Sequence, residues 1–124
     1  MLPSDFDLND VGMELFEEYV DETNQQNIVL DTRFALDKTP VHADIKKVLR
    51  IIHNLIQISL DQIPESIMIQ TGRGQGEYYI GVLLEDGTFP KDIELSGFKE
   101  VAKLMKGRIE ANASNIRLWL PKSE

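Results

Sequence analysis

Residue types that carry catalysis or bind metals are few in this chain, and none stands beside a suitable partner. The 124 residues contain no cysteine and two histidines, His42 and His53. His42 and Asp44 form too small a cluster to hold a metal ion. His53 lies within an apolar helical pattern, and we interpret it as a surface or packing residue rather than a phosphoryl acceptor. We find no nucleophile beside a plausible base, so the sequence predicts neither a metal site nor a catalytic residue.

Three glycines at steps of two, Gly72, Gly74 and Gly76, suggest at first a loop that binds phosphate. Neither common phosphate-binding motif has this spacing, and no helical pattern follows the loop. We therefore interpret it as a hairpin loop between two strands, Ser66–Gln70 and Tyr78–Leu84.

The charge balance excludes two classes of partner. Thirteen Lys and Arg residues against 21 Asp and Glu residues give a net charge of −8. Nucleic acids and anionic membranes both bind basic surfaces, so we expect neither as a partner. The apolar stretch Val48–Leu60 is interrupted by polar residues and is too short to span a bilayer. The first residues do not form a signal-peptide pattern, and we expect a cytoplasmic protein.

Hydrophobic periodicity predicts three helices and five strands. The helices begin at Leu8, Ile45 and Gly97, and the strands are Ile28–Leu36, Ser66–Gln70, Tyr78–Leu84, Arg108–Ala113 and Asn115–Leu120. Helices and hairpins segregate along the chain instead of alternating, which favours an α+β fold. We predict one domain over residues 1–124 with loose ends at 1–6 and 121–124. It is a two-layer sandwich with about three helices on one face of a mixed or antiparallel sheet.

The order of these elements and four local strings resemble the ATP-binding domain of sensor histidine kinases, which has the Bergerat or GHKL fold. FDLNDVGMELFEEYV resembles the family's first helix, and VLDTRFALDKTPVHADIKKVLRIIHNLIQISLDQIP resembles its first strand and N-box helix. IGVLLEDGTFP resembles the strand and turn of the G1 box, and VAKLMKGRIEANASNIRLWLP resembles the last helix and closing hairpin. The resemblance covers nearly the whole chain and implies the GHKL fold.

The N-box helix of the family presents a polar residue and two asparagines at steps of four, on one stripe that faces the nucleotide. At these positions this chain has Arg50, Asn54 and Ile58. The family's second asparagine holds the magnesium ion that bridges the phosphates. Ile58 has no oxygen to offer such a hard cation, so the resemblance implies that the magnesium site is lost.

The G1 box of the family reads aspartate-x-glycine-x-glycine, and its aspartate accepts a hydrogen bond from the adenine amino group. Here Glu85 takes the place of the aspartate, and Gly87 follows it. Phe89 replaces the second glycine, and it is bulky where the backbone must approach the nucleotide closely.

Two further parts of the family's pocket are missing. The family has a flexible lid before its last helix and a glycine-rich segment whose N–H groups meet the phosphates. In this chain Lys91–Ser96 is the whole connection, and Gly97 alone precedes the helix. These losses predict that neither ATP nor magnesium is a cofactor. The remaining positions form a vestigial pocket: Arg50, Asn54, Ile58, Glu85, Gly87 and Gly97.

Ile51 and Ile58 add a second apolar line to the N-box-like helix. They are expected to contact a neighbouring loop that has collapsed over the vacant pocket, or to form an apolar docking patch for another protein.

The resemblance and the losses together favour a non-catalytic signalling module that is not an enzyme. It would bind a histidine kinase, a phosphotransfer protein or a response regulator, and a homo-oligomer is compatible with the sequence. One alternative is a weak nucleotide binder that uses Asn54, Glu85, Gly87 and Gly97. Another is a relative of the anti-sigma-factor kinases, and the alternative fold is a generic α+β sandwich.

Overall fold

An aspartate begins each of the two long helices. Asp7 precedes α1 (Leu8–Gln25), and its Oδ1 accepts a hydrogen bond from the Asn9 backbone N–H at 2.9 Å. Asp44 precedes α2 (Ile45–Asp61), and its Oδ1 accepts from the Lys46 N–H at 3.0 Å. Each carboxylate thus satisfies a backbone donor that the helix itself leaves unpaired. Both predicted helix starts are confirmed.

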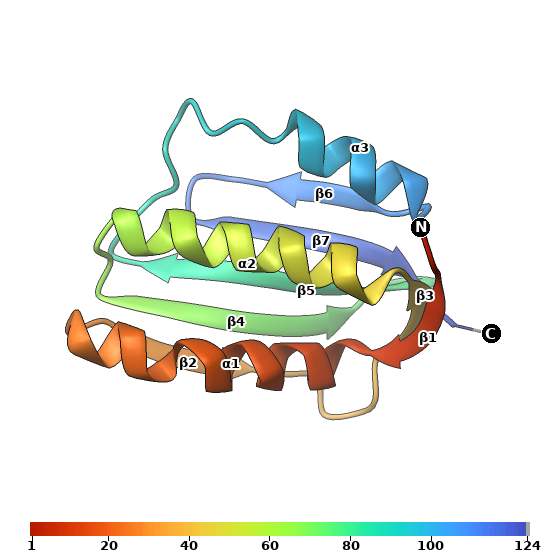
Figure 1. Cartoon of the computed structure of the whole chain (residues 1–124), viewed down its shortest axis with the longest axis horizontal. Coiled ribbons are helices and arrows are strands. Elements are labelled where there is room, and N and C mark those ends of the chain that lie inside the picture. The colour runs from red at the N-terminus through yellow and green to blue at the C-terminus, as the bar shows by residue number, and fades with distance from the viewer. Residues whose placement is uncertain (124) are drawn as a thin grey trace.

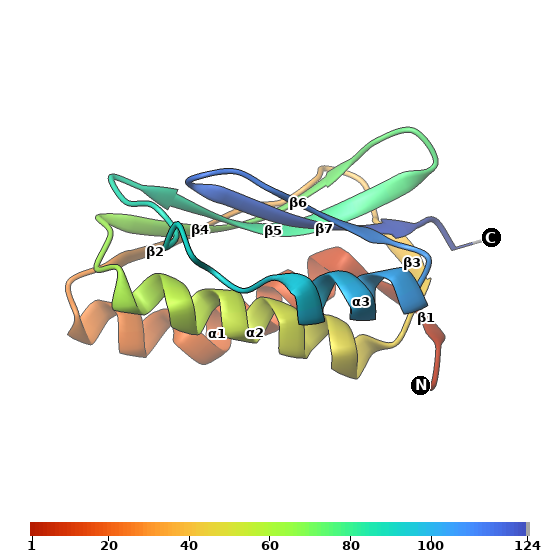
Figure 2. The same ribbon diagram turned by 90° about the horizontal axis from the view of Figure 1, so that it is seen from above.

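The computed structural model describes residues 1–123, and these form two layers (Figures 1 and 2). Five strands make the main sheet in the order β2-β4-β5-β7-β6. Their bounds are β2 (Val29–Arg33), β4 (Ser66–Arg73), β5 (Glu77–Glu85), β6 (Arg108–Ala111) and β7 (Asn115–Pro121). The β2–β4 pair is parallel and the other pairs are antiparallel. Figure 2 shows α1, α2 and α3 (Ser96–Leu104) on the same face of this sheet. The predicted α+β sandwich with a mixed sheet is confirmed.

The core lies between the helices and the inner face of the sheet. Alternate residues of the central strands, such as Ile67, Ile80 and Leu118, are completely buried. On α2, Ile52 and Leu55 are buried opposite them. Each such side chain stabilises the fold by roughly 1.5–3 kcal/mol relative to exposure. Within the described chain, no helix combines the length and the apolar character needed to cross a bilayer.

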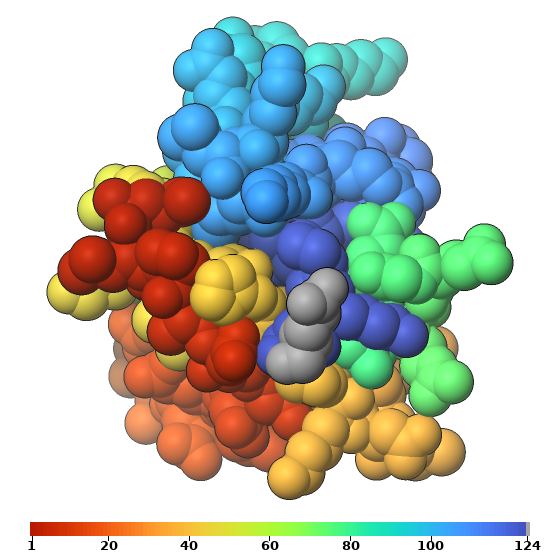
Figure 3. All heavy atoms as spheres, turned by 90° about the vertical axis from the view of Figure 1, so that its right-hand side faces the viewer, coloured from red at the N-terminus to blue at the C-terminus, as the bar shows by residue number. Residues whose placement is uncertain are grey.

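The ends of the chain are more ordered than the sequence predicts. Residues 1–6 are expected to be loose, yet β1 (Ser4–Asp7) pairs with β3 (Pro40–Ala43) in a small antiparallel sheet at one end of the molecule (Figure 3). Residues 121–124 are also expected to be loose, but the Ser123 N–H donates to the Pro40 carbonyl at 3.0 Å. Residue 124 lies outside the described residues. These pairings join distant parts of the sequence, so local periodicity does not reveal them.

Some predicted boundaries are wrong by a few residues. The strand predicted to reach Leu36 ends at Arg33, and the Leu36 side chain is fully exposed. The last helix is expected to end at Lys106, with Gly107 in the left-handed conformation that terminates it. Instead Lys106 takes that conformation, with φ of 62°, and the Gly107 N–H donates to the Ala102 carbonyl at 2.8 Å. This is a Schellman motif shifted by one residue from the prediction.

Candidate functional site

The stripe on α2 that corresponds to the N box lies partly at the surface. Arg50 is exposed, and Asn54 and Ile58 are half-buried. Ile58 packs against the core cluster. Ser59, the next residue, is completely buried, and its Oγ donates to the Leu55 carbonyl at 2.7 Å. The stripe therefore offers one amide and one guanidinium group, and no carboxamide at the position of Ile58.

The turn after β5 is held by neighbouring backbone. The Glu85 side chain is exposed, while its carbonyl accepts a hydrogen bond from the Glu65 N–H at 3.1 Å. Asp86 has a φ of 51°, in the left-handed region. Gly87 passes so close to Pro64 that an added Cβ would lie 2.9 Å from the proline Cβ. Gly87 is thus required by the packing of the turn itself, without any ligand.

Phe89 anchors the segment that follows this turn. Its side chain is 4% exposed and belongs to the core cluster. Its backbone N–H donates to the Ala113 carbonyl at 2.8 Å, at the tip of the β6–β7 hairpin. Ile93 and Leu95 also pack against the core before α3 begins. The short connection between β5 and α3 is therefore part of the hydrophobic core.

The start of α3 lacks a side-chain cap. The residue before it, Leu95, makes no capping hydrogen bond. Glu94 instead accepts a hydrogen bond from the Ser96 backbone N–H at 2.8 Å, and hydrogen bonds from Ser96 lower the pKa of this carboxyl group. Gly97 is exposed, and no atom lies within 4 Å of the position its Cβ would take. A carboxylate of the chain thus occupies a donor at the helix start, where the family's phosphates would bind.

The two isoleucines considered for docking differ in exposure. Ile51 is 2% exposed and lies in the core cluster, so it is not available to another protein. Its expected role in a docking patch is therefore corrected by the structure. Ile58 is half-buried against the same cluster. Phe89 belongs to this cluster and Leu95 packs against it. Both isoleucines therefore share a core with the segment between β5 and α3.

Three of the cavities on the described chain have volumes of about 640, 460 and 390 Å³. None of the six vestigial-pocket residues lines any of them. Within residues 1–123, no group of three His, Cys, Asp or Glu side chains is placed to hold a metal ion.

The glycine loop and His53 have structural roles. A Cβ on Gly74 would lie 2.7 Å from Cζ3 of Trp119, and one on Gly72 would overlap the Tyr79 ring. The loop glycines therefore leave room for aromatic rings. The Tyr19 hydroxyl oxygen lies 2.7 Å from His53 Nδ1 and accepts a hydrogen bond from Gln57 Nε2 at 3.0 Å. These contacts join α1 to α2.

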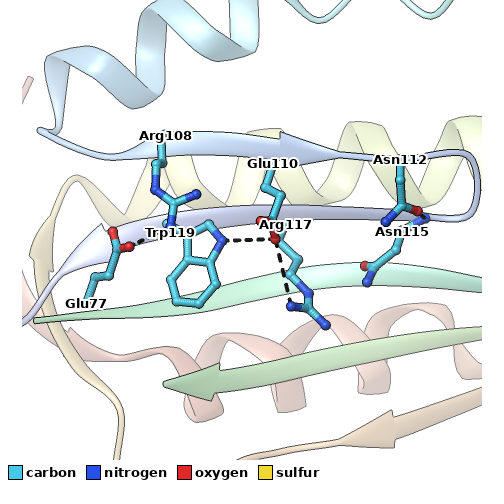
Figure 4. Close-up of polar contacts among 7 residues, drawn as sticks. All are labelled: Glu77, Arg108, Glu110, Asn112, Asn115, Arg117 and Trp119. Atoms are coloured by element: carbon cyan, nitrogen blue, oxygen red, sulfur yellow. Dashed lines mark hydrogen bonds and ion pairs between the residues drawn. The ribbon is translucent and has the colours of Figure 1, made fainter. Parts of the chain in front are cut away.

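The outer face of the sheet carries a polar network that the sequence does not reveal (Figure 4). Arg108 donates to Glu77 at 2.6 Å, and its guanidinium lies 4.8 Å from the centre of the Trp119 ring. The Trp119 indole N–H donates to Glu110 at 3.4 Å, and Arg117 lies 3.8 Å from the same carboxylate. These contacts link three strands, and among residues 1–123 the Arg117 Nε atom remains buried without a hydrogen-bond partner. We interpret the network as support for the sheet, worth about 0–1 kcal/mol for each exposed ion pair.

Comparisons with known proteins agree with the fold. No protein-family model and no curated protein matches the sequence. Among solved structures, the nucleotide-free catalytic domain of the histidine kinase ThkA superposes with a TM-score of 0.84 at 17% identity, over 100% of both chains. The histidine kinase domain of the E. coli osmosensor EnvZ superposes with a TM-score of 0.76 at 16% identity, over 100% of this chain and 92% of EnvZ.

A further match is ThkA in complex with the response regulator protein TrrA. Its TM-score is 0.75 at 16% identity, over 98% of this chain and 42% of that one. At these identities the likeness concerns the fold alone. The chain has the GHKL-like fold of histidine kinase catalytic domains.

Proposed function

We propose that this chain is a non-catalytic interaction module of a bacterial two-component or phosphorelay pathway. The observation that carries the proposal is the burial of Phe89 in the core, together with its hydrogen bond to Ala113. Phe89 stands where the resemblance places a glycine that the nucleotide approaches. Opening this segment to admit phosphates would expose the ring and the apolar residues that follow it, at a cost of several kcal/mol.

The groups that remain at the pocket positions fit a nucleotide poorly. Ile58 supplies no oxygen for magnesium, and Glu94 occupies the Ser96 N–H at the start of α3. Phosphates placed there would meet that carboxylate in a chain of net charge −8. This arrangement supports a role that requires neither ATP nor magnesium.

The proposed partner is a histidine kinase, a phosphotransfer protein or a response regulator. The support is the shared fold, since ThkA has been solved in complex with its response regulator TrrA. This chain superposes on 42% of the ThkA chain in that complex, and we propose that the shared framework keeps a surface for such a partner.

Thermal unfolding with millimolar Mg-ATP tests the proposal that the chain does not use ATP. A ligand at one hundred times its dissociation constant stabilises a protein by about 2.7 kcal/mol, which raises the melting temperature of a domain of this size by several degrees. We expect no shift beyond that given by magnesium alone. A histidine kinase catalytic domain that binds ATP serves as the positive control. A shift of several degrees, or turnover of ATP, would refute the proposal.

Surface plasmon resonance tests the proposal that the chain binds a protein of a two-component pathway. The immobilised chain is exposed to each purified kinase, phosphotransfer protein and response regulator of its source genome. We expect one of them to bind with a micromolar or lower dissociation constant. If none binds at about 100 micromolar, the assignment to two-component signalling is wrong.

A further inference from the structure

The largest of the three cavities lies far from the vestigial pocket, at the end of the molecule seen in Figure 3. It is a groove of about 640 Å³ between the first residues, β3, the end of α3 and the end of β7. Its apolar lining comes from both ends of the chain, from β3 and from the end of α3. Pro3 and Leu104 are exposed and Pro121 is half-buried, while Ala43 and Met105 belong to the buried core. Asp5, His42, Lys106 and Lys122 supply its polar groups.

Exposed apolar side chains gather around this groove. Seven large hydrophobic residues of the described chain are exposed, and three of them lie at this end: Met1, Leu2 and Leu104. Leu104 is 66% exposed in the last turn of α3. It also borders a second hollow of about 390 Å³, which Glu100 and Lys103 complete. Single exposed leucines are common, so the feature that distinguishes Leu104 is its position between two hollows and not its exposure alone.

The charge at this surface is opposite to that of the chain as a whole. Lys103 and Lys106 flank Leu104, and among residues 1–123 neither lies in an ion pair. The two hollows are lined by three lysines, Lys103, Lys106 and Lys122, and by two acids, Asp5 and Glu100. Lysines within about 8–10 Å dominate the field that a small ligand feels at physiological salt. The surface therefore attracts carboxylates although the net charge is −8.

We propose that this groove binds a segment of another protein that presents an apolar side chain beside carboxylates. The apolar side chain packs against Leu104, beside Pro3 and Pro121, and the carboxylates face Lys103 and Lys106. The assignment deepens the proposed function and rests on it, since it names where and by what chemistry a signalling partner docks.

A small molecule is a poorer fit than a protein segment. Small-molecule sites hold their ligand with a few fixed polar groups in an enclosed cavity. Here the His42 and Asp5 side chains are 56% and 64% exposed, and the lysines are flexible point charges. A second copy of this chain would also bring carboxylates to the groove, and sedimentation distinguishes that occupant from a segment of another protein.

A peptide titration followed by amide NMR signals tests the proposal. The probe is a synthetic amphipathic helical peptide of leucine and glutamate, and the matched peptide has lysine in place of every glutamate. We expect the leucine–glutamate peptide to shift signals of residues 42–43, 104–106 and 122 saturably, and to leave those of α1 unchanged. The lysine peptide should not perturb the groove.

Variants connect the shifts to the groove. We expect Leu104→Glu and Lys106→Glu each to weaken binding of the leucine–glutamate peptide by about tenfold or more, a loss of about 1.4 kcal/mol. The control is Met13→Glu, which changes an exposed apolar residue on α1 and should leave binding unchanged. All three positions are at the surface, and thermal melting verifies that each variant is folded.

Several results would overturn the proposal. They are an absence of saturable shifts at millimolar peptide, shifts located elsewhere, binding that survives both groove variants, or equal binding of the lysine peptide at the groove. Self-association through the groove, seen by sedimentation and abolished by Leu104→Glu, would also overturn it, because the occupant would then be a second copy.

The fate of the proposed function is read separately. If a two-component protein binds the chain and Leu104→Glu does not weaken that complex, the groove assignment fails while the proposed function stands. If the peptide binds at the groove but no two-component protein binds, the proposed function fails and the groove assignment stands.

Discussion

Replacing Phe89 with alanine should lower the free energy of unfolding by about 3–5 kcal/mol. The ring is 4% exposed and lies in the main core cluster, so its removal costs both the transfer energy of the side chain and the cavity it leaves. The backbone hydrogen bond to Ala113 is still possible in the variant. The loss therefore measures the packing of the ring, which is what closes the connection between β5 and α3.

Urea unfolding is the assay, followed by the fluorescence of Trp119, the single tryptophan, and by circular dichroism. With a slope of about 2 kcal/mol per molar urea, the midpoint should fall by about 1.5–2.5 M at an unchanged slope. Phe89→Leu keeps most of the apolar volume and should cost only about 1 kcal/mol. Leu36→Ala removes a side chain that is fully exposed and should change stability by less than about 0.5 kcal/mol.

A loss below about 1 kcal/mol for Phe89→Ala would show that the ring is not part of the core. The connection could then leave the protein surface as a lid does, and the reason for excluding nucleotide from this domain would disappear.

Two further predictions concern other parts of the molecule. Asp7 caps α1, and although partial burial raises the pKa of its carboxyl group, hydrogen bonds from Thr39 and Asn9 lower that pKa to below the ordinary value of 3.8. The stabilisation from Asp7 is thus present at neutral pH and lost as the pH falls through the folded pKa. The free energy of unfolding should therefore fall more steeply below about pH 4 in the native chain than in Asp7→Asn. Parallel pH profiles of the two proteins would contradict this prediction. Gly74→Ala places a Cβ 2.7 Å from the Trp119 ring and should cost about 1–3 kcal/mol while shifting the tryptophan emission. An unchanged emission spectrum with unchanged stability would mean that the ring does not lie over the loop.

Local patterns in the sequence predict the long elements because each carries its own evidence. The apolar spacing of α1 and α2 and the aspartates before them are visible within one window of sequence. β1 and β3 are missed since each has four residues and gains its order from distant segments, β1 from β3 and β3 from both β1 and the end of the chain. Lys106, and not Gly107, takes the left-handed conformation. Gly107 is needed for a different reason: the Trp119 backbone on the last strand leaves no room for a Cβ there.

For the candidate sites too, the sequence shows what is local and does not show what depends on distant segments. Phe89 is recognisable in the sequence as a bulky residue in place of a glycine. Its burial is not predictable, because the turn around it has no periodicity. The groove combines residues near positions 1–5, 42–43, 104–106 and 121–122, so no stretch of sequence contains it. Lysines beside an exposed leucine read as an ordinary helix surface until the first residues and the last strand are placed next to them.

The two edge strands of the main sheet have a consequence for aggregation. β2 and β6 have five and four residues, and they end the strand order on either side. Charged side chains line both, with Asp31 and Arg33 on β2 and Arg108 and Glu110 on β6. Short, charged edges resist the addition of a strand from another molecule. The sheet is therefore protected from growing into a continuous β-structure, and a partner is directed to side-chain surfaces instead of the free backbone of the sheet.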